Sequence, residues 1–130
     1  AVGVHIWAAV SLTRLNHAAR DTGYKAGRKS PATTYAARTM RYGGFIILLF
    51  IIYHLLHFTF GTVHPDFVPG DVYNNLVVGF SVPWVSAFYI VAMIALGMHL
   101  YHGTWSGLQT LGLAHPQINE GRRKLAAAIA

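Results

Sequence analysis

One stretch of the sequence, Phe88 to Gly112, constrains the fold more than any other, because it is apolar over a length that can cross a bilayer. Between Pro83 and Leu113 only the side chains of His99 and His102 can carry a charge. At ~1.5 Å rise per residue, a helix over this run exceeds the ~30 Å hydrocarbon core of a membrane. The run therefore predicts a transmembrane helix. A histidine at that depth needs a partner, and the partner that uses the imidazole lone pair is a metal, above all haem iron.

The composition supports a membrane protein. Of the 130 residues, 54% are hydrophobic and only 11% are charged. A chain of this length is too short for a large soluble core but long enough for a few membrane spans. The absence of cysteine excludes disulfides, thiolate zinc sites and cysteine-ligated iron–sulfur clusters within this chain, and leaves histidine as the strong soft-metal ligand. The net charge of +6 does not indicate a nucleic-acid partner, because Lys and Arg are scattered between apolar runs.

Both ends of the sequence are apolar but short. The chain begins AVGVHIWAAV without Met and closes on RKLAAAIA, and neither stretch is long enough to span a membrane alone. No basic segment precedes the first stretch, so it lacks the pattern of a signal peptide. We expect residues 1–130 to form a single membrane-anchor domain that is truncated at both ends, the interior of a longer subunit.

The order of apolar and polar segments predicts an all-α transmembrane helix bundle. Residues 1–15 read as the second half of a membrane helix that leaves the bilayer near Arg14, and a second crossing runs from about Tyr42 to Gly61. The following loop, Thr62 to Val82, is rich in Pro, Gly and Asp, with a short interfacial helix expected at Tyr73 to Phe80. Pro83 opens the third crossing at its first turn, where a missing N–H costs nothing. A further helix is expected to begin at Leu125.

The basic residues indicate the orientation of these crossings. All ten lie in or beside two connections, residues 16–40 and 114–124, and are Arg14, Arg20, Lys25, Arg28, Lys29, Arg38, Arg41, Arg122, Arg123 and Lys124. The connection 62–82 has none and carries Asp66 and Asp71. By the positive-inside rule the two basic loops face the cytoplasm and the acidic loop faces outward. The expected location is the bacterial cytoplasmic membrane.

Depth separates the intramembrane histidines into two layers. With a rise of ~1.5 Å per residue, His5 lies ~13 Å and His99 ~20 Å in from the inner boundary. Two histidines on different helices at similar depth have the arrangement that bis-imidazole ligation of one b-type haem requires. His54, nearer the outer face, belongs to a second layer, and its partner is expected before Ala1. The plainer interpretation is that each histidine hydrogen-bonds across a helix pair.

Other polar residues near these layers have two interpretations each. His57 and His102 follow His54 and His99 by three residues, but no span contains the carboxylates that a di-metal site needs. They either hydrogen-bond to haem propionates or a quinone carbonyl, or bond between helices. Arg14 and Arg41 at the inner boundary either pair with propionates or fix the topology. Solvated side chains are expected for the histidines in loops or at helix ends, which are His17, His64 and His115.

Three stretches resemble a known family, the five-helix, di-haem cytochrome b membrane anchor of succinate dehydrogenases and fumarate reductases (complex II). They are HIWAAVSLTRLNHAAR around His5, LLFIIYHLLHFTFG around His54, and FYIVAMIALGMHLYHGTWSGLQTLG around His99, the last being the most specific. The chain is similar to helices two, three and four and the start of helix five. The resemblance implies that His5 and His99 ligate the haem proximal to the iron–sulfur subunit, and that His54 ligates a distal haem whose second ligand is on helix one.

The resemblance also implies a function. In that family a flavoprotein subunit oxidises succinate, an iron–sulfur subunit passes the electrons on, and the anchor delivers them through b haem to a quinone, commonly menaquinone. The anchor has no catalytic residues of its own, so the chain is an enzyme only as a subunit. Two alternatives stay open at this point. One is the cytochrome b subunit of another quinone-linked oxidoreductase, of the hydrogenase or formate dehydrogenase type, and the other is a haem-free membrane scaffold or transporter.

Overall fold

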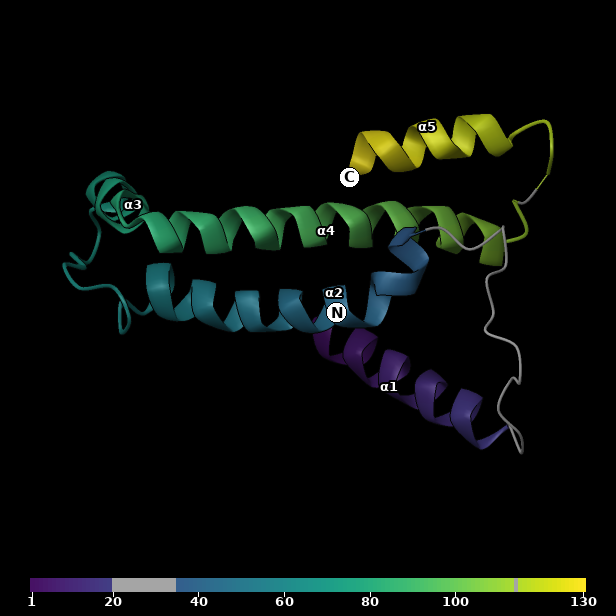
Figure 1. The fold of residues 1–130 in the computed structure, drawn as a ribbon, viewed down its shortest axis with the longest axis horizontal. Coiled ribbons are helices and arrows are strands. Elements are labelled where there is room, and N and C mark those ends of the chain that lie inside the picture. Colours follow the sequence, from purple (N-terminus) through teal and green to yellow (C-terminus); the bar gives the residue numbers. More distant parts are fainter. Residues whose placement is uncertain (20–34, 114) are drawn as a thin grey trace. The chain divides into compact units, whose positions relative to one another are not determined.

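The computed structural model describes residues 1–19, 35–113 and 115–130, and the regular elements in these ranges are helices (Figure 1). The predicted all-α class is therefore confirmed. The chain forms two compact units, Ala1–Ala32 and Thr33–Ala130, which are described separately below. Most of the basic connection 16–40, including Lys25 and Lys29, lies outside the described residues.

The first unit contains one helix, α1, over Val2–Ala18. It continues one turn beyond Arg14, where the sequence suggested an exit from the bilayer. No residue of α1 is buried. His17 lies in the last turn, where a cationic side chain would complement the helix dipole.

The second unit is organised by two long antiparallel helices, α2 (Tyr35–His54) and α4 (Pro83–Thr110), which pack side by side (Figure 1). Two segments are long and apolar enough to cross a membrane, Thr39–Thr59 and Pro83–Thr110, with mean hydropathies of 1.7 and 1.6. They match the second and third predicted crossings. Helix α2 begins before the predicted Tyr42 because the preceding residues YAARTMR include several good helix formers.

Helix α4 begins and ends for reasons that can be read in its sequence. Pro83 occupies the first turn, as predicted. At the other end Gly112 adopts φ +82, the Leu113 N–H donates to the Leu108 carbonyl (3.0 Å), and the Gly112 N–H donates to the Gln109 carbonyl (3.1 Å). This is a Schellman motif, which satisfies the last carbonyls of the helix and needs a residue with positive φ.

The connection between α2 and α4 starts with a π-helical turn and ends in a short helix. The α2 helix continues as η1 (Leu55–Thr59), in which the Phe60 N–H donates to the Leu55 carbonyl at 2.8 Å. Helix α3 (Val72–Ser81) confirms the interfacial helix predicted at residues 73–80, and the Asp71 carboxylate caps it by accepting from the Asn74 N–H (3.1 Å). Figure 1 shows α3 almost end-on against the start of α4.

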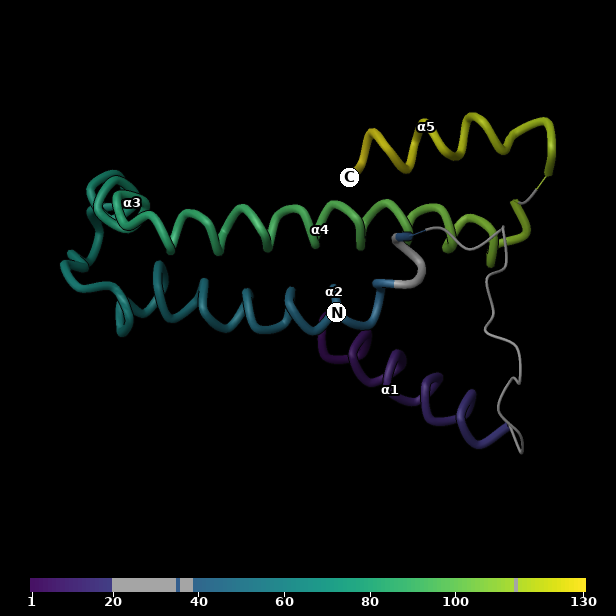
Figure 2. Tube along the Cα trace, viewed as in Figure 1, coloured from purple at the N-terminus to yellow at the C-terminus, as the bar shows by residue number. Residues whose placement is uncertain are grey.

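The last helix, α5, spans Asn119–Ile129 and packs back along α4 (Figure 2). The predicted start at Leu125 was therefore too late. Residues 119–124, which the sequence placed in a basic loop, form the first turns of the helix, because their charges find partners there. Lys124 pairs with Glu120 one turn earlier at 2.8 Å, and the Arg122 guanidinium reaches α4.

Candidate functional site

The predicted site residues fall on both units. Helix α1 carries His5 and Arg14, both exposed within the first unit, while Arg41, His54, His57, His99 and His102 belong to the second. The proposed pairing of His5 with His99 joins two separately described units and stays a prediction. The same holds for the pairing of Arg14 or Arg41 with a propionate.

His99 and His102 lie half-buried in the second half of α4. The His99 ring packs toward α2, with its Cε1 atom 3.7 Å from the place that a Cβ on Gly44 would take. The Nδ1 atoms of both imidazoles are buried, and that of His102 has no hydrogen-bond partner among the described residues. A buried imidazole nitrogen without a partner costs free energy, so this atom needs a partner that the described residues do not supply.

At the other end of the helix pair, the hydroxyl of Tyr89 lies between two imidazoles. Its Oη atom is 3.2 Å from Nδ1 of His57 and 3.4 Å from Nδ1 of His54. Tyr89 belongs to α4, His54 ends α2 and His57 lies in η1, so these contacts join the two apolar segments Thr39–Thr59 and Pro83–Thr110. For His57 the structure thus shows the interhelical bond that was one of its two interpretations.

His64 belongs to the same cluster, although the sequence suggested a solvated side chain. It is 4% exposed, its ring stacks on that of His57 at a centroid distance of 4.8 Å, and its Nε2–H donates to the Asn75 carbonyl at 2.9 Å. The Asn75 side chain in turn bonds both the N–H and the carbonyl of Val68 (2.9 and 2.8 Å). His64 therefore holds the connection between η1 and α4 against η1, and its position in a loop gave no sign of this role.

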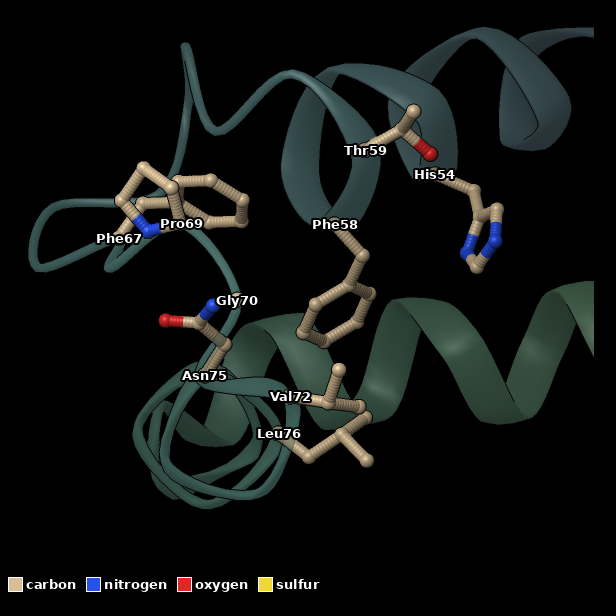
Figure 3. A pocket seen from close by; sticks show the side chains of 9 residues that line it. All are labelled: His54, Phe58, Thr59, Phe67, Pro69, Gly70, Val72, Asn75 and Leu76. Carbon is tan, nitrogen blue, oxygen red and sulfur yellow. The ribbon is translucent and has the colours of Figure 1, made fainter.

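A hollow of about 460 Å³ lies beside this cluster (Figure 3). Apolar side chains form most of its wall, and the polar groups at its edge come from His54, Thr59 and Asn75. Figure 3 shows the His54 imidazole and the Phe58 ring on the side of the membrane helix and Val72 and Leu76 on α3. His54, the residue predicted to be an axial ligand of the second haem, therefore lines the same hollow as residues of the connection between η1 and α4.

The C-terminal end of α4 is held by a different contact. The Arg122 guanidinium of α5 lies 4.2 Å from the centre of the Trp105 ring and donates to the Trp105 carbonyl at 3.0 Å and to Asn119 Oδ1 at 2.8 Å. Arg122 is only 6% exposed. This residue therefore packs α5 on α4, beyond the role in topology that the sequence suggested.

No group of three or more metal-ligating side chains occurs within the described residues.

A comparison with known families identifies the chain. The family model of the succinate dehydrogenase/fumarate reductase transmembrane subunit matches residues 17–130 of the sequence. The chain belongs to this family. The resemblance noted in the sequence is confirmed, and the chain is a membrane protein of helical type. No curated protein and no solved structure matches it.

The match to the succinate dehydrogenase/fumarate reductase transmembrane subunit covers α2 to α5 and only the end of α1. His54 and His99 lie inside it, whereas His5 precedes it. The residues that the sequence did not reveal as part of the site are Tyr89, His64 and Asn75, because a tyrosine near a membrane end or a histidine in a loop has many ordinary roles.

Proposed function

We propose that this chain is the membrane cytochrome b subunit of a succinate:quinone oxidoreductase, of the five-helix, di-haem type. It anchors the flavoprotein and iron–sulfur subunits at a bacterial cytoplasmic membrane and passes electrons through b haem to a quinone, menaquinone in this proposal. The observation that carries the proposal is the presence of histidines inside both membrane-spanning segments of a chain from this family. The chain itself contributes no succinate chemistry.

The residues fit a haem at two levels. At the inner level, His99 lies against the small residue Gly44, and the neighbouring His102 keeps a buried Nδ1 atom without a partner in the described part of the chain. At the outer level, His54 lines a largely apolar hollow and its Nδ1 atom faces Tyr89. A haem held by two imidazoles supplies one-electron transfer without binding oxygen.

Each candidate residue has one role in this proposal. His5 and His99 are the axial ligands of the inner haem, and His54 is an axial ligand of the outer one. His102, with Arg14 and Arg41 nearer the cytoplasmic side, contacts propionates or the quinone. His57 acts through its bond to Tyr89. The argument that His5 and His99 bind the same haem is their similar depth on separate helices.

The orientation follows from charge. The basic residues gather in the connections 16–40 and 114–124, which face the cytoplasm in this proposal, whereas residues 62–82 face outward. An iron–sulfur subunit docked on the cytoplasmic side lies nearest the His5/His99 layer.

The reduced-minus-oxidised absorption spectrum of the purified complex tests the proposal. We expect the α-band of a low-spin b-type haem, and we expect its amplitude to fall when His99 is replaced by Ala. Replacement of His115, an exposed histidine after α4, is the matched control and should leave the spectrum unchanged. A complex without any b-type band would show that the chain is a haem-free anchor, and a band unaffected by His99→Ala would exclude the inner ligand.

A further inference from the structure

We propose that Tyr89 is a positioning residue for His54: it accepts a hydrogen bond from Nδ1–H of His54 and donates its own proton to Nδ1 of His57, so that Nε2 of His54 is presented as the ligand. This inference rests on the proposed role of His54 as an axial ligand of the outer haem. It adds a residue outside the ligand set, and it assigns a direction to the hydrogen bonds between the two membrane helices.

The argument starts from the number of protons that the hydroxyl can share. Nδ1 of His57 and Nδ1 of His54 are within 3.2 and 3.4 Å of Tyr89 Oη. A phenol has one O–H, so it can donate to only one of these nitrogens, and the other nitrogen must donate to the phenol oxygen. When the O–H is donated to one of the two imidazoles, the three groups form a directed chain with only two orders.

Iron ligation selects one of these orders. A neutral imidazole that binds a metal through Nε2 carries its proton on Nδ1, and that N–H commonly donates to an outer partner that fixes the ring. If His54 donates to Tyr89, the Tyr89 O–H is left for Nδ1 of His57, which must then carry its own proton on Nε2. Ligation of iron through Nε2 of His54 thus determines which atom is the donor in each of the two hydrogen bonds.

Packing fixes Tyr89 and His57 more firmly than it fixes His54. Tyr89 is 9% exposed, and its ring meets the edges or faces of Phe50 and Phe80 at centroid distances of 5.0 and 4.9 Å. His57 is 2% exposed and stacks on Tyr53 at 5.2 Å. His54, in contrast, is exposed at the edge of the hollow. Because the hydroxyl cannot move and the ligand ring can, the orientation of His54 depends on Tyr89.

The consequence is a lower reduction potential for the outer haem. An axial imidazole that donates its N–H to an acceptor is more basic and favours the ferric state. In Tyr89→Phe the acceptor is absent while the ring and its packing remain. We expect the midpoint potential of the outer haem to rise, and a tenfold loss of ferric relative to ferrous binding would correspond to ~59 mV.

The test is a redox titration of the intact complex, followed by the absorbance of each b-type haem. The control variant is Tyr53→Phe, which removes a hydroxyl from the same aromatic cluster. The Tyr53 hydroxyl makes no hydrogen bond among the described residues, whereas the Tyr89 hydroxyl contacts two imidazoles. Tyr89→Phe should raise the potential of the haem that His54→Ala removes, and should leave the other haem unchanged. Tyr53→Phe should leave both unchanged.

Two results would overturn the inference in different ways. If His54→Ala removes a haem but Tyr89→Phe titrates like the wild type or like Tyr53→Phe, then Tyr89 does not position the ligand, and the proposed function stands. If the wild-type complex has no haem that His54→Ala removes, then the proposed outer ligand is wrong and this inference fails with it.

Discussion

At the residue scale, the cluster formed by His57, His64 and Phe58 depends on Gly79, a residue without a side chain. A Cβ atom on Gly79 of α3 would lie 2.9 Å from Cε1 of His57, 3.1 Å from Nε2 of His64 and 3.1 Å from Cε1 of Phe58. The first of these contacts is closer than carbon atoms tolerate, and the two imidazole rings are buried and held by hydrogen bonds. Glycine at this position thus lets α3 approach the two stacked imidazoles.

We therefore expect Gly79→Ala to destabilise the subunit by about 1–3 kcal/mol, the usual cost of overpacking a filled interior. The thermal unfolding temperature of the solubilised complex should fall. The matched control is Gly107→Ala on α4, where no atom lies within 4 Å of the added Cβ and the higher helix propensity of Ala should leave stability unchanged or slightly raised. Equal unfolding temperatures for the two variants would contradict this account of the cluster.

At the element scale, the helices that the sequence predicted well are those with long apolar runs. Hydropathy placed α4 and the core of α2, while Pro83 and Gly112 marked the ends of α4. Hydropathy failed where polar residues are helical. The first turns of α5 contain charged residues, so they read as a loop until the contact between Arg122 and Trp105 is known. The π-helical turn η1 has no sequence signal in a run of apolar residues.

The Arg122 contact should determine how firmly α5 packs on α4. Arg122→Ala removes two hydrogen bonds and a cation–π contact, and we expect a loss of about 2 kcal/mol. Hydrogen exchange of the α5 amides should rise in this variant. Arg123→Ala is the control, because Arg123 is exposed and lies 5.3 Å from the same ring, and its effect should stay within ~0.5 kcal/mol. Equal exchange in the two variants would remove Arg122 from the packing of α5.

At the scale of the whole molecule, the His5/His99 layer and the His54 layer are assigned to the inner and outer sides from the distribution of basic residues. The assignment therefore depends on the orientation of the chain in the membrane. A cysteine in place of Asn74, which is exposed on α3, should react with an impermeant thiol reagent from the outer side of intact cells. A cysteine in place of Ser30, in the basic connection, should react only after the membrane is opened. Because the chain has no native cysteine, each signal would come from one site. The reverse pattern would exchange the inner and outer layers and place His54 on the side of the soluble partner.

The sequence predicted the site only in outline. It identified the intramembrane histidines, because an imidazole in an apolar run needs a partner, and it separated His54 from His99 by depth. It did not predict the role of Tyr89 or His64, because their hydrogen-bond partners lie at least 11 positions away along the chain. Contacts of that kind depend on how the helices pack and on the fold of the connection between η1 and α4, which periodicity does not reveal.

The central claim is that one b-type haem lies between His5 and His99. The most direct measurement is the low-temperature reduced-minus-oxidised spectrum of the intact complex carrying His5→Ala or His99→Ala, with each variant compared to the wild type. Both variants should lose the same low-spin b-type signal and keep the other, because each removes one of two axial ligands from a single iron. Loss of a different signal in each variant, or of none in either, would contradict the claim.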